Sequence, residues 1–144
     1  MGATTLVSVE EYLRTSFPDA DREYVDGRIV ERNGGEVDHS DVQTAIAHYM
    51  RTRYKKRVWA GVEVRVQVRT TRFRIPDVTV MLGGKPAERI IRTPPIVAIE
   101  VLSGRSRRIS RRENCRLSGL RRSIHLDNQS GNAARICAYL ARQP

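Results

Sequence analysis

The chain is poor in features that identify several protein classes. It has only two cysteines, Cys115 and Cys137, with no CxxC pair and no histidine at metal-ligand spacing, so we expect neither a zinc site nor a disulfide framework. No stretch approaches the run of about 20 apolar residues that a membrane helix needs, and no basic-then-apolar leader opens the chain. We therefore expect a cytoplasmic protein without a membrane segment.

Lysine is absent after Lys85, although the chain is strongly basic. The formal net charge is +10 over 144 residues. Residues 1–100 carry a net charge of only +2, whereas residues 101–144 carry +8, from ten arginines and two acids. Basic proteins commonly bind nucleic acids, because their cations release counterions from phosphates, but here most of the excess lies in the last third. We therefore divide the chain into a domain at 1–103 and an Arg-rich tail at 104–144.

Local patterns predict a helix and a hairpin near the start of the chain. Ser8 and Glu11 have the spacing of a capping box, which predicts a short helix from about Ser8 to Phe17. Apolar residues flank the Asp26-Gly27 pair, which predicts two short strands joined by a tight turn over Glu23–Glu31.

The next seventy residues predict one long helix and three strands. Apolar residues at three- and four-residue spacing predict the principal helix, from Val42 to the basic run at 55–57. Alternating valines predict one strand over Val58–Val68, and a second is expected over Ile75–Leu82. The almost wholly apolar run Ile96–Leu102 is typical of a central strand. Beyond Ser103 the periodicity disappears, and we assign no structure there.

Two carboxylates stand on strands of this predicted sheet. Asp77 heads the Ile75–Leu82 strand, and Glu100 lies inside the apolar Ile96–Leu102 run. An ionised carboxylate in such a run is costly unless it is paired, hydrogen-bonded or bound to metal. Mg²⁺ prefers oxygen ligands, and one or two carboxylates commonly hold it. An Asp after Pro is also a common turn residue, and this alternative for Asp77 stays open.

Five motifs in order resemble the Uma-type putative restriction endonucleases, a branch of the PD-(D/E)XK nuclease superfamily. They are SVEEYL at 8–13, EYVDG at 23–27, His39, IPDV at 75–78 and EVLS at 100–103. The resemblance covers about residues 5–103. It implies an α/β (α+β) fold, with a restriction-endonuclease-like mixed sheet flanked by helices. It also implies a Mg²⁺-dependent (or Mn²⁺-dependent) DNA endonuclease.

The resemblance further implies roles for individual residues. Asp77 and Glu100 would be the metal ligands and catalytic residues, and Glu23 would be an auxiliary catalytic acid at the edge of the site. His39 matches a family histidine, and its alternative, a polar residue at a helix start, stays open. DNA is the implied partner. The sequence leaves the oligomeric state open, with a homodimer as one option.

The chain departs from the family at the lysine. The superfamily has lysine two residues after the Glu, where this chain has Leu102, and the Uma-type branch supplies it from the following helix. Codons for residues 112–136, read one nucleotide later, permit EKIADYRDFGVPYIWIINPETRRAY, which resembles that helix and the strand after it. We therefore hypothesise a reading-frame shift between about Ser103 and Glu113, with the C-terminal helix and strands lost or disordered. The alternative is an authentic, divergent basic tail.

Three functions are consistent with these observations. The first is a Mg²⁺-dependent DNA endonuclease, impaired in this chain by loss of the lysine. The second is an inactive remnant that retains weak metal or nucleic-acid binding. The third is a basic nucleic-acid-binding module in which tail arginines contact phosphates. Those arginines are Arg105, Arg107, Arg108, Arg111 and Arg112.

Overall fold

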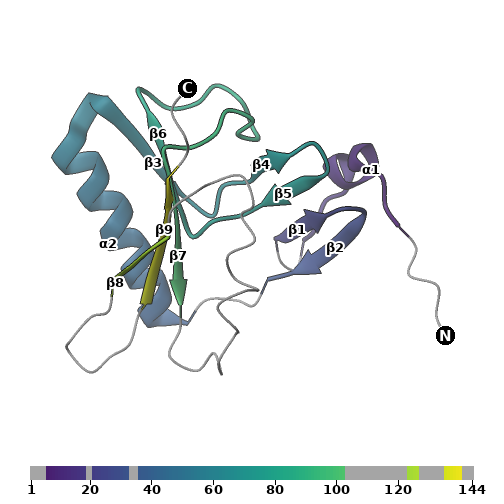
Figure 1. Cartoon of the computed structure of the whole chain (residues 1–144), viewed down its shortest axis with the longest axis horizontal. Helices are drawn as coiled ribbons and strands as arrows, with labels where there is room; N and C mark the ends of the chain where they lie inside the picture. Colours follow the sequence, from purple (N-terminus) through teal and green to yellow (C-terminus); the bar gives the residue numbers. More distant parts are fainter. Residues whose placement is uncertain (1–5, 19–20, 33–35, 103–122, 127–134, 141–144) are drawn as a thin grey trace.

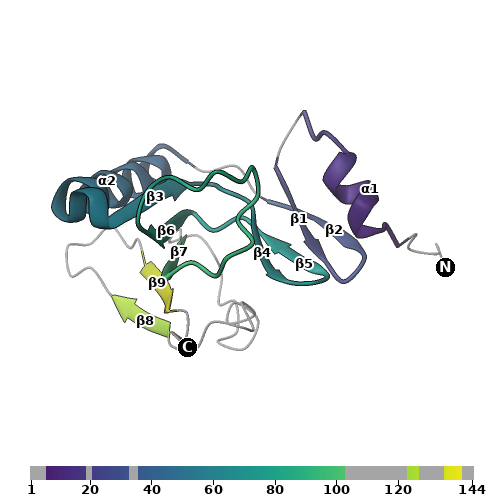
Figure 2. The ribbon, with the colours of Figure 1, turned by 90° about the horizontal axis from the view of Figure 1, so that it is seen from above.

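Two antiparallel sheets, of four and five strands, make up the fold, and the long helix α2 packs on the larger one (Figure 1). The structure is a computed structural model, and it describes residues 6–18, 21–32, 36–102, 123–126 and 135–140. Viewed from above, α2 lies along one face of the larger sheet, while α1 lies beside the smaller sheet at the other end of the molecule (Figure 2). The helices are α1 (Val9–Arg14) and α2 (Val37–Tyr54), and a 3₁₀ turn follows α2 at Lys55–Arg57.

The smaller sheet has its own aromatic core beneath α1. Its strand order is β2-β1-β5-β4, with β1 at Arg22–Val25, β2 at Arg28–Glu31, β4 at Val66–Arg69 and β5 at Arg72–Arg74. Tyr12 from α1 packs against Tyr24 and Phe73, and all three side chains are buried. The Ser8 hydroxyl caps α1 by accepting a hydrogen bond of 3.1 Å from the Glu11 backbone N–H, so the capped helix is confirmed, although it is shorter than expected.

The hairpin predicted over Glu23–Glu31 is also confirmed. Its turn residues Asp26 and Gly27 both have positive φ, 49° and 90°, as a two-residue turn between twisted strands requires. A Cβ at Gly27 would also lie 2.9 Å from the end of the exposed Leu6 side chain, which would have to shift. The Asp26 carboxylate accepts hydrogen bonds from Thr71 and Arg72, which ties this turn to the neighbouring β5.

The larger sheet carries the main apolar core. Its strand order is β3-β6-β7-β9-β8, with β3 at Val58–Val62, β6 at Val78–Leu82, β7 at Val97–Leu102, β8 at Ser123–Leu126 and β9 at Arg135–Leu140. Ala47 of α2 packs against buried residues of three strands, namely Ala60, Val80 and Ile99. The principal helix and the strands near Ile75–Leu82 and Ile96–Leu102 are therefore confirmed, and α2 begins earlier than the apolar pattern indicated.

The single strand predicted over Val58–Val68 is wrong. The chain breaks at Glu63, where φ is 50°, and the two halves become β3 and β4 in different sheets. The break separates the alternating valines, so Val62 is 43% exposed whereas Val66 is fully buried. Period-two alternation continues through the break, and the pattern therefore could not reveal it.

The expected α+β class, with helices flanking a sheet, is confirmed. The pairings between the named strands are all antiparallel, where the resemblance implied a mixed sheet. Strands β8 and β9 lie in the tail, where we expected the C-terminal strands to be lost or disordered, and that expectation is wrong for these two segments. The residues lack periodicity, but β9 pairs with β7 and β8 pairs with β9. Of the helices in the described part of the chain, none has the length and apolar character to cross a membrane.

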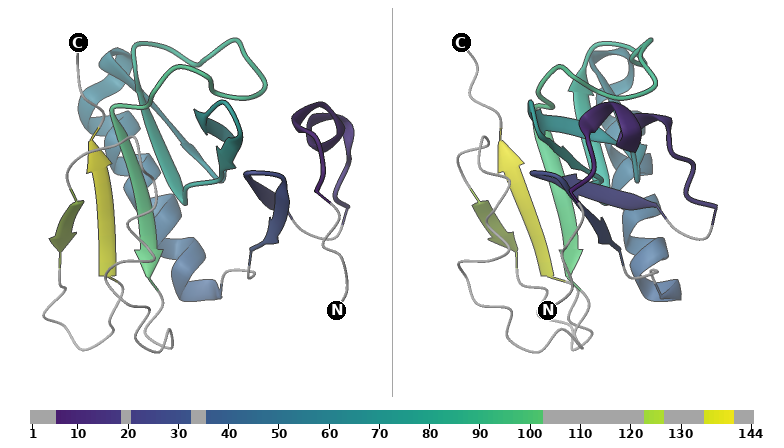
Figure 3. Two further views of the ribbon diagram at one scale, coloured as in Figure 1. Left: turned by 45° about the vertical axis from the view of Figure 1, so that its right-hand side comes forward. Right: turned by 90° about the vertical axis from the view of Figure 1, so that its right-hand side faces the viewer.

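The chain passes between the two sheets twice in a short stretch. It first crosses at Glu63, from β3 to β4, and crosses back over residues 75–77, from β5 to β6. Figure 3 shows the smaller sheet set beside the larger one, with these crossings between them. The second crossing contains Asp77, so this carboxylate lies where the two sheets meet.

Candidate functional site

Strands β6 and β7 bring Asp77 and Glu100 together. Val78 pairs with Ile99 in the antiparallel register, so the next pair outward is Asp77 opposite Glu100. Directly opposed residues of an antiparallel pair present their side chains to the same face. The Val101 backbone N–H also donates to Asp77 Oδ2 over 2.6 Å, which fixes the Asp77 carboxylate against β7.

Three side chains from other elements converge on the second oxygen of Asp77. The Arg32 guanidinium, at the end of β2, donates from Nη2 to Oδ1 over 2.6 Å. The Gln43 amide donates to the same oxygen over 3.0 Å, and His39 Nε2 lies 3.2 Å from it. The Asp77 side chain is only 2% exposed, so these contacts and Val101 replace water around a buried anion.

Glu100 is held in an environment that disfavours its charged form. Burial and the neighbouring Asp77 carboxylate raise the pKa of Glu100 from its ordinary value of 4.5 to about 8. The negative charge of Glu23 adds to this rise in pKa, whereas Arg32 and Arg74 oppose it. The two arginines therefore compensate only part of the negative charge of the three acids. Such a cluster would be stabilised by an added cation.

Glu23 lies beside this pair but is already engaged. Its Oε1 accepts a hydrogen bond of 3.0 Å from the Ile75 backbone N–H, and its Oε2 is ion-paired with Arg74. Its charge still acts on Glu100, as the raised pKa of that residue indicates. Its auxiliary role remains a prediction.

The contribution of α2 was only partly visible in the sequence. His39, whose role was left open, and Gln43 are four residues apart, so both face Asp77 from one side of the helix. Gln43 is buried on the same face as Ala47. A buried polar residue on an otherwise apolar helical face was the signal that could have identified it. Nothing in the sequence identified Arg32, because its contact with Asp77 spans 45 positions.

Glu63 joins the site from the first crossing between the sheets. Its backbone N–H donates to the Asp77 carbonyl over 3.2 Å, and its Oε1 accepts from Gln43 over 3.4 Å. The Arg32 guanidinium lies 3.9 Å from the same carboxylate. Glu63 therefore forms the outer edge of the network around Asp77, and the sequence analysis missed it.

The donor chemistry at Asp77 and Glu100 fits a divalent cation. Among the described residues, no group of three or more His, Cys, Asp or Glu side chains is arranged to hold a metal ion. Two adjacent carboxylates are nevertheless a sufficient protein contribution for Mg²⁺, which retains waters and binds substrate phosphate. A cation at Asp77 Oδ1 would take the place of the Arg32 guanidinium, which now supplies the positive charge there.

The remaining predicted residues lie outside this region. Arg105, Arg107, Arg108, Arg111 and Arg112 fall among residues that the structure does not describe. The predicted boundary between domain and tail near residue 103 also falls at the start of such a segment.

The fold has a counterpart among solved structures. It is similar to the crystal structure of a putative nuclease of the DUF820 group from Anabaena variabilis, with a TM-score of 0.54 and 19% sequence identity. The match covers 62% of this chain and 54% of that chain, so this chain spans about half the length of that protein. At this identity the likeness concerns the fold alone.

The sequence gives the family directly. A model of the Uma2 family, described as putative restriction endonucleases, matches residues 9–132, and the chain belongs to this family. The matched range includes Asp77, Glu100 and the residues that contact Asp77, namely Arg32, His39, Gln43, Glu63 and Val101. It continues past residue 103, where the resemblance noted in the sequence ended. No curated protein sequence matches the chain.

Proposed function

We propose that this protein is a metal-dependent DNA endonuclease. Asp77 and Glu100 would be the metal ligands of the site that hydrolyses phosphodiester bonds. The observation that carries the proposal is the pairing of these two carboxylates on neighbouring strands, in surroundings that raise the pKa of Glu100 to about 8. Perturbed carboxyl groups with a specific charged partner are characteristic of functional sites. Membership in a family of putative restriction endonucleases supports DNA as the substrate, and a cytoplasmic location is part of the proposal.

The network around Asp77 would hold the first ligand in place. Val101 fixes one carboxylate oxygen, while His39 and Gln43 of α2 fix the direction of the other. Partners of this kind orient metal ligands, and their loss commonly lowers metal affinity or activity about 10- to 100-fold. His39 and Gln43 therefore act as positioning residues.

Glu100 would complete the pair of protein ligands. A bound divalent cation would neutralise charge on the scissile phosphate and make a bound water more acidic. Glu100 must lose its proton to act as a ligand, and burial together with Asp77 opposes that loss until a cation arrives. Glu23 would keep Arg74 and the Ile75 backbone in position at the edge of the site.

The missing lysine makes activity in this chain weak. A positioned cation that stabilises the transition state is worth about 10² to 10³ in rate. The position two residues after Glu100 is Leu102, and no lysine follows Lys85 that a later helix could supply. We propose the reading-frame shift in residues 104–144 as the explanation for this loss; the family model matches part of that segment, up to residue 132, in the present frame, and this observation opposes the hypothesis.

The test is plasmid cleavage with Mg²⁺ or Mn²⁺ and with EDTA. Asp77→Asn and Glu100→Gln should remove metal-dependent cleavage, because each removes a charged ligand. Asp41→Asn is the matched control, since Asp41 is an exposed carboxylate on α2 away from the site, and it should cut like the parent. Cleavage that persists in both site variants would refute the proposal. A folded chain that binds DNA and never cuts would instead favour the inactive remnant or the basic binding module.

A further inference from the structure

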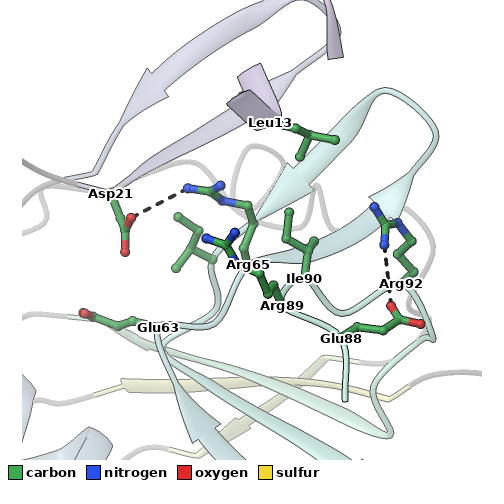
Figure 4. Close-up of a pocket in the computed structure, with 9 residues that line it drawn as sticks. Leu13, Asp21, Glu63, Arg65, Glu88, Arg89, Ile90 and Arg92 are labelled. Atoms are coloured by element: carbon green, nitrogen blue, oxygen red, sulfur yellow. Dashed lines mark ion pairs between the residues drawn. The ribbon is translucent and has the colours of Figure 1, made fainter. Parts of the chain in front are cut away.

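A cavity of about 430 Å³ lies next to the Asp77 network. Figure 4 shows its wall, which includes three arginines, Arg65, Arg89 and Arg92. They come from the segment after the first crossing between the sheets and from the loop after β6. Glu63 lines this cavity and also accepts the hydrogen bond from Gln43, so the cavity borders the proposed metal site.

Backbone hydrogen bonds hold the arginines in a fixed arrangement. The Gln67 N–H donates to the Ile91 carbonyl over 2.8 Å, and the Ile91 N–H donates to the Arg65 carbonyl over 3.0 Å. This short parallel bridge places Val66 and Ile91 in the core. Alternation along the two segments then directs Arg65 and Arg92 to the opposite side, which is the cavity.

The Arg65 guanidinium is held in position but has few hydrogen bonds. Its Cζ lies 4.9 Å above the Tyr12 ring, and its ion pair with Asp21 is long, at 3.7 Å. Its Nε is buried and has no hydrogen-bond partner among the described residues. The buried Nε cannot reach a ligand, so the terminal amino groups of Arg65 are the donors that would bind a phosphate group in the cavity.

The other two arginines are also weakly engaged. Arg92 lies 3.8 Å from Glu88, and about half of each side chain is exposed, so this pair contributes little. Arg89 is exposed on the loop, and within the described part of the chain it has no hydrogen bond or ion pair. The wall also carries three carboxylates, Asp21, Glu63 and Glu88, but each is at least half exposed, and none forms a close ion pair with an arginine of the wall.

The size and the apolar surface of the cavity indicate a ligand that is larger than a free anion. Its volume far exceeds the space of a single phosphate, and Leu13, Ile75 and Ile90 supply apolar surface. We propose that it binds one nucleotide of a nucleic-acid strand, with the phosphate on Arg65, Arg89 and Arg92 and the sugar or base against the apolar side chains. This proposal deepens the nuclease proposal, because it assigns a substrate phosphate next to the one that would be cut.

The experiment measures binding of a fluorescent single-stranded oligonucleotide and of a duplex, by anisotropy in EDTA, so that no cleavage occurs. Arg65→Met and the double variant R89A/R92A should each weaken binding of at least one probe about tenfold. The slope of log K against log salt should fall by about one for each phosphate that the variant no longer neutralises. Arg28→Ala removes an exposed arginine of β2 outside the cavity, and it should leave affinity nearly unchanged.

Three results separate this proposal from its alternatives. Unchanged affinity and salt slope in R89A/R92A would overturn it, and because both residues are exposed, this variant should fold even if Arg65→Met does not. The proposal would also be overturned if inorganic phosphate bound the cavity while oligonucleotide affinity did not depend on these arginines. In the third result, the chain never cuts DNA while its arginine variants bind oligonucleotides more weakly. That result would support nucleotide binding in the cavity and reject the nuclease proposal.

Discussion

Replacing Arg32 with methionine should tighten the binding of divalent metal ions. The Arg32 guanidinium now occupies Asp77 Oδ1 at 2.6 Å. Its charge also lowers the pKa of Glu100, so its removal makes the Glu100 proton harder to lose and offsets part of the gain. A cation that uses this oxygen must first displace the arginine. Methionine keeps much of the apolar stem but removes the competing charge, so the ligand oxygen is released in advance.

The size of the effect follows from the hydrogen bond that the variant cannot make. A hydrogen bond between charged groups contributes about 1.5–3 kcal/mol, which corresponds to metal binding that is about 10- to 150-fold tighter in Arg32→Met. The metal-free variant should be destabilised by a similar amount, because the buried Asp77 loses its counterion. For a chain of this size the melting temperature should fall by about 2–4 °C per kcal/mol.

Calorimetric titration with Mn²⁺ and Mg²⁺, combined with thermal melting, measures both effects. The metal should raise the melting temperature of Arg32→Met more than that of the parent chain, since a ligand that binds the folded state more tightly stabilises it more. Arg28→Met serves as the control, because Arg28 lies on the same strand and is exposed. Metal affinity that is unchanged or weaker in Arg32→Met would refute the reasoning.

Three further predictions concern pH, the tail and the backbone. Glu100→Gln should melt at a higher temperature than the parent at pH 8 and near the same temperature at pH 4.5. The folded chain keeps the Glu100 proton up to a pKa of about 8, while the unfolded chain loses it near 4.5, so the parent loses stability as pH rises between these values. Restoring residues 104–144 to the shifted frame should raise plasmid cleavage about 10²- to 10³-fold, because it returns the lysine; equal cleavage by the two chains would remove the reading-frame argument. Lys55 ends α2 with a φ of 47°, a conformation that glycine adopts without strain. Lys55→Gly should therefore raise the free energy of unfolding in urea by up to about 1 kcal/mol, and a lower free energy of unfolding would contradict this.

Local signals in the sequence were enough to predict most elements. The capping pair Ser8 and Glu11, the Asp26-Gly27 turn and the apolar runs each depend on neighbouring residues, and the structure confirms these elements. The break at Glu63 was not predictable in this way, because a left-handed residue within alternating valines leaves the pattern intact. At that residue the chain passes from the larger sheet to the smaller one.

The candidate site likewise contains some residues that the sequence could reveal and others that it could not. Asp77 and Glu100 were proposed from their motifs and their strands, and the structure places those strands side by side, with the two residues opposite each other. Arg32, Gln43 and Glu63 act through contacts with Asp77 or its neighbours that join distant parts of the chain. Sequence spacing carries no information about such contacts, except for the four-residue interval between His39 and Gln43.

The position of Asp77 determines which variant best separates catalysis from folding. Its carboxylate joins β2, α2 and β7 through Arg32, Gln43 and the Val101 N–H. An Asn side chain has one oxygen, so Asp77→Asn must turn an amide group toward Val101 or toward Arg32, and either orientation removes a buried hydrogen bond. Lost cleavage in that variant could therefore result from unfolding. Glu100→Gln removes a ligand charge and replaces a partly buried acid whose charged form is disfavoured, so we expect it to be at least as stable as the parent at pH 8 and inactive. A variant that is more stable and does not cut would assign the loss to chemistry, whereas a stable variant that still cuts would exclude Glu100 as a ligand.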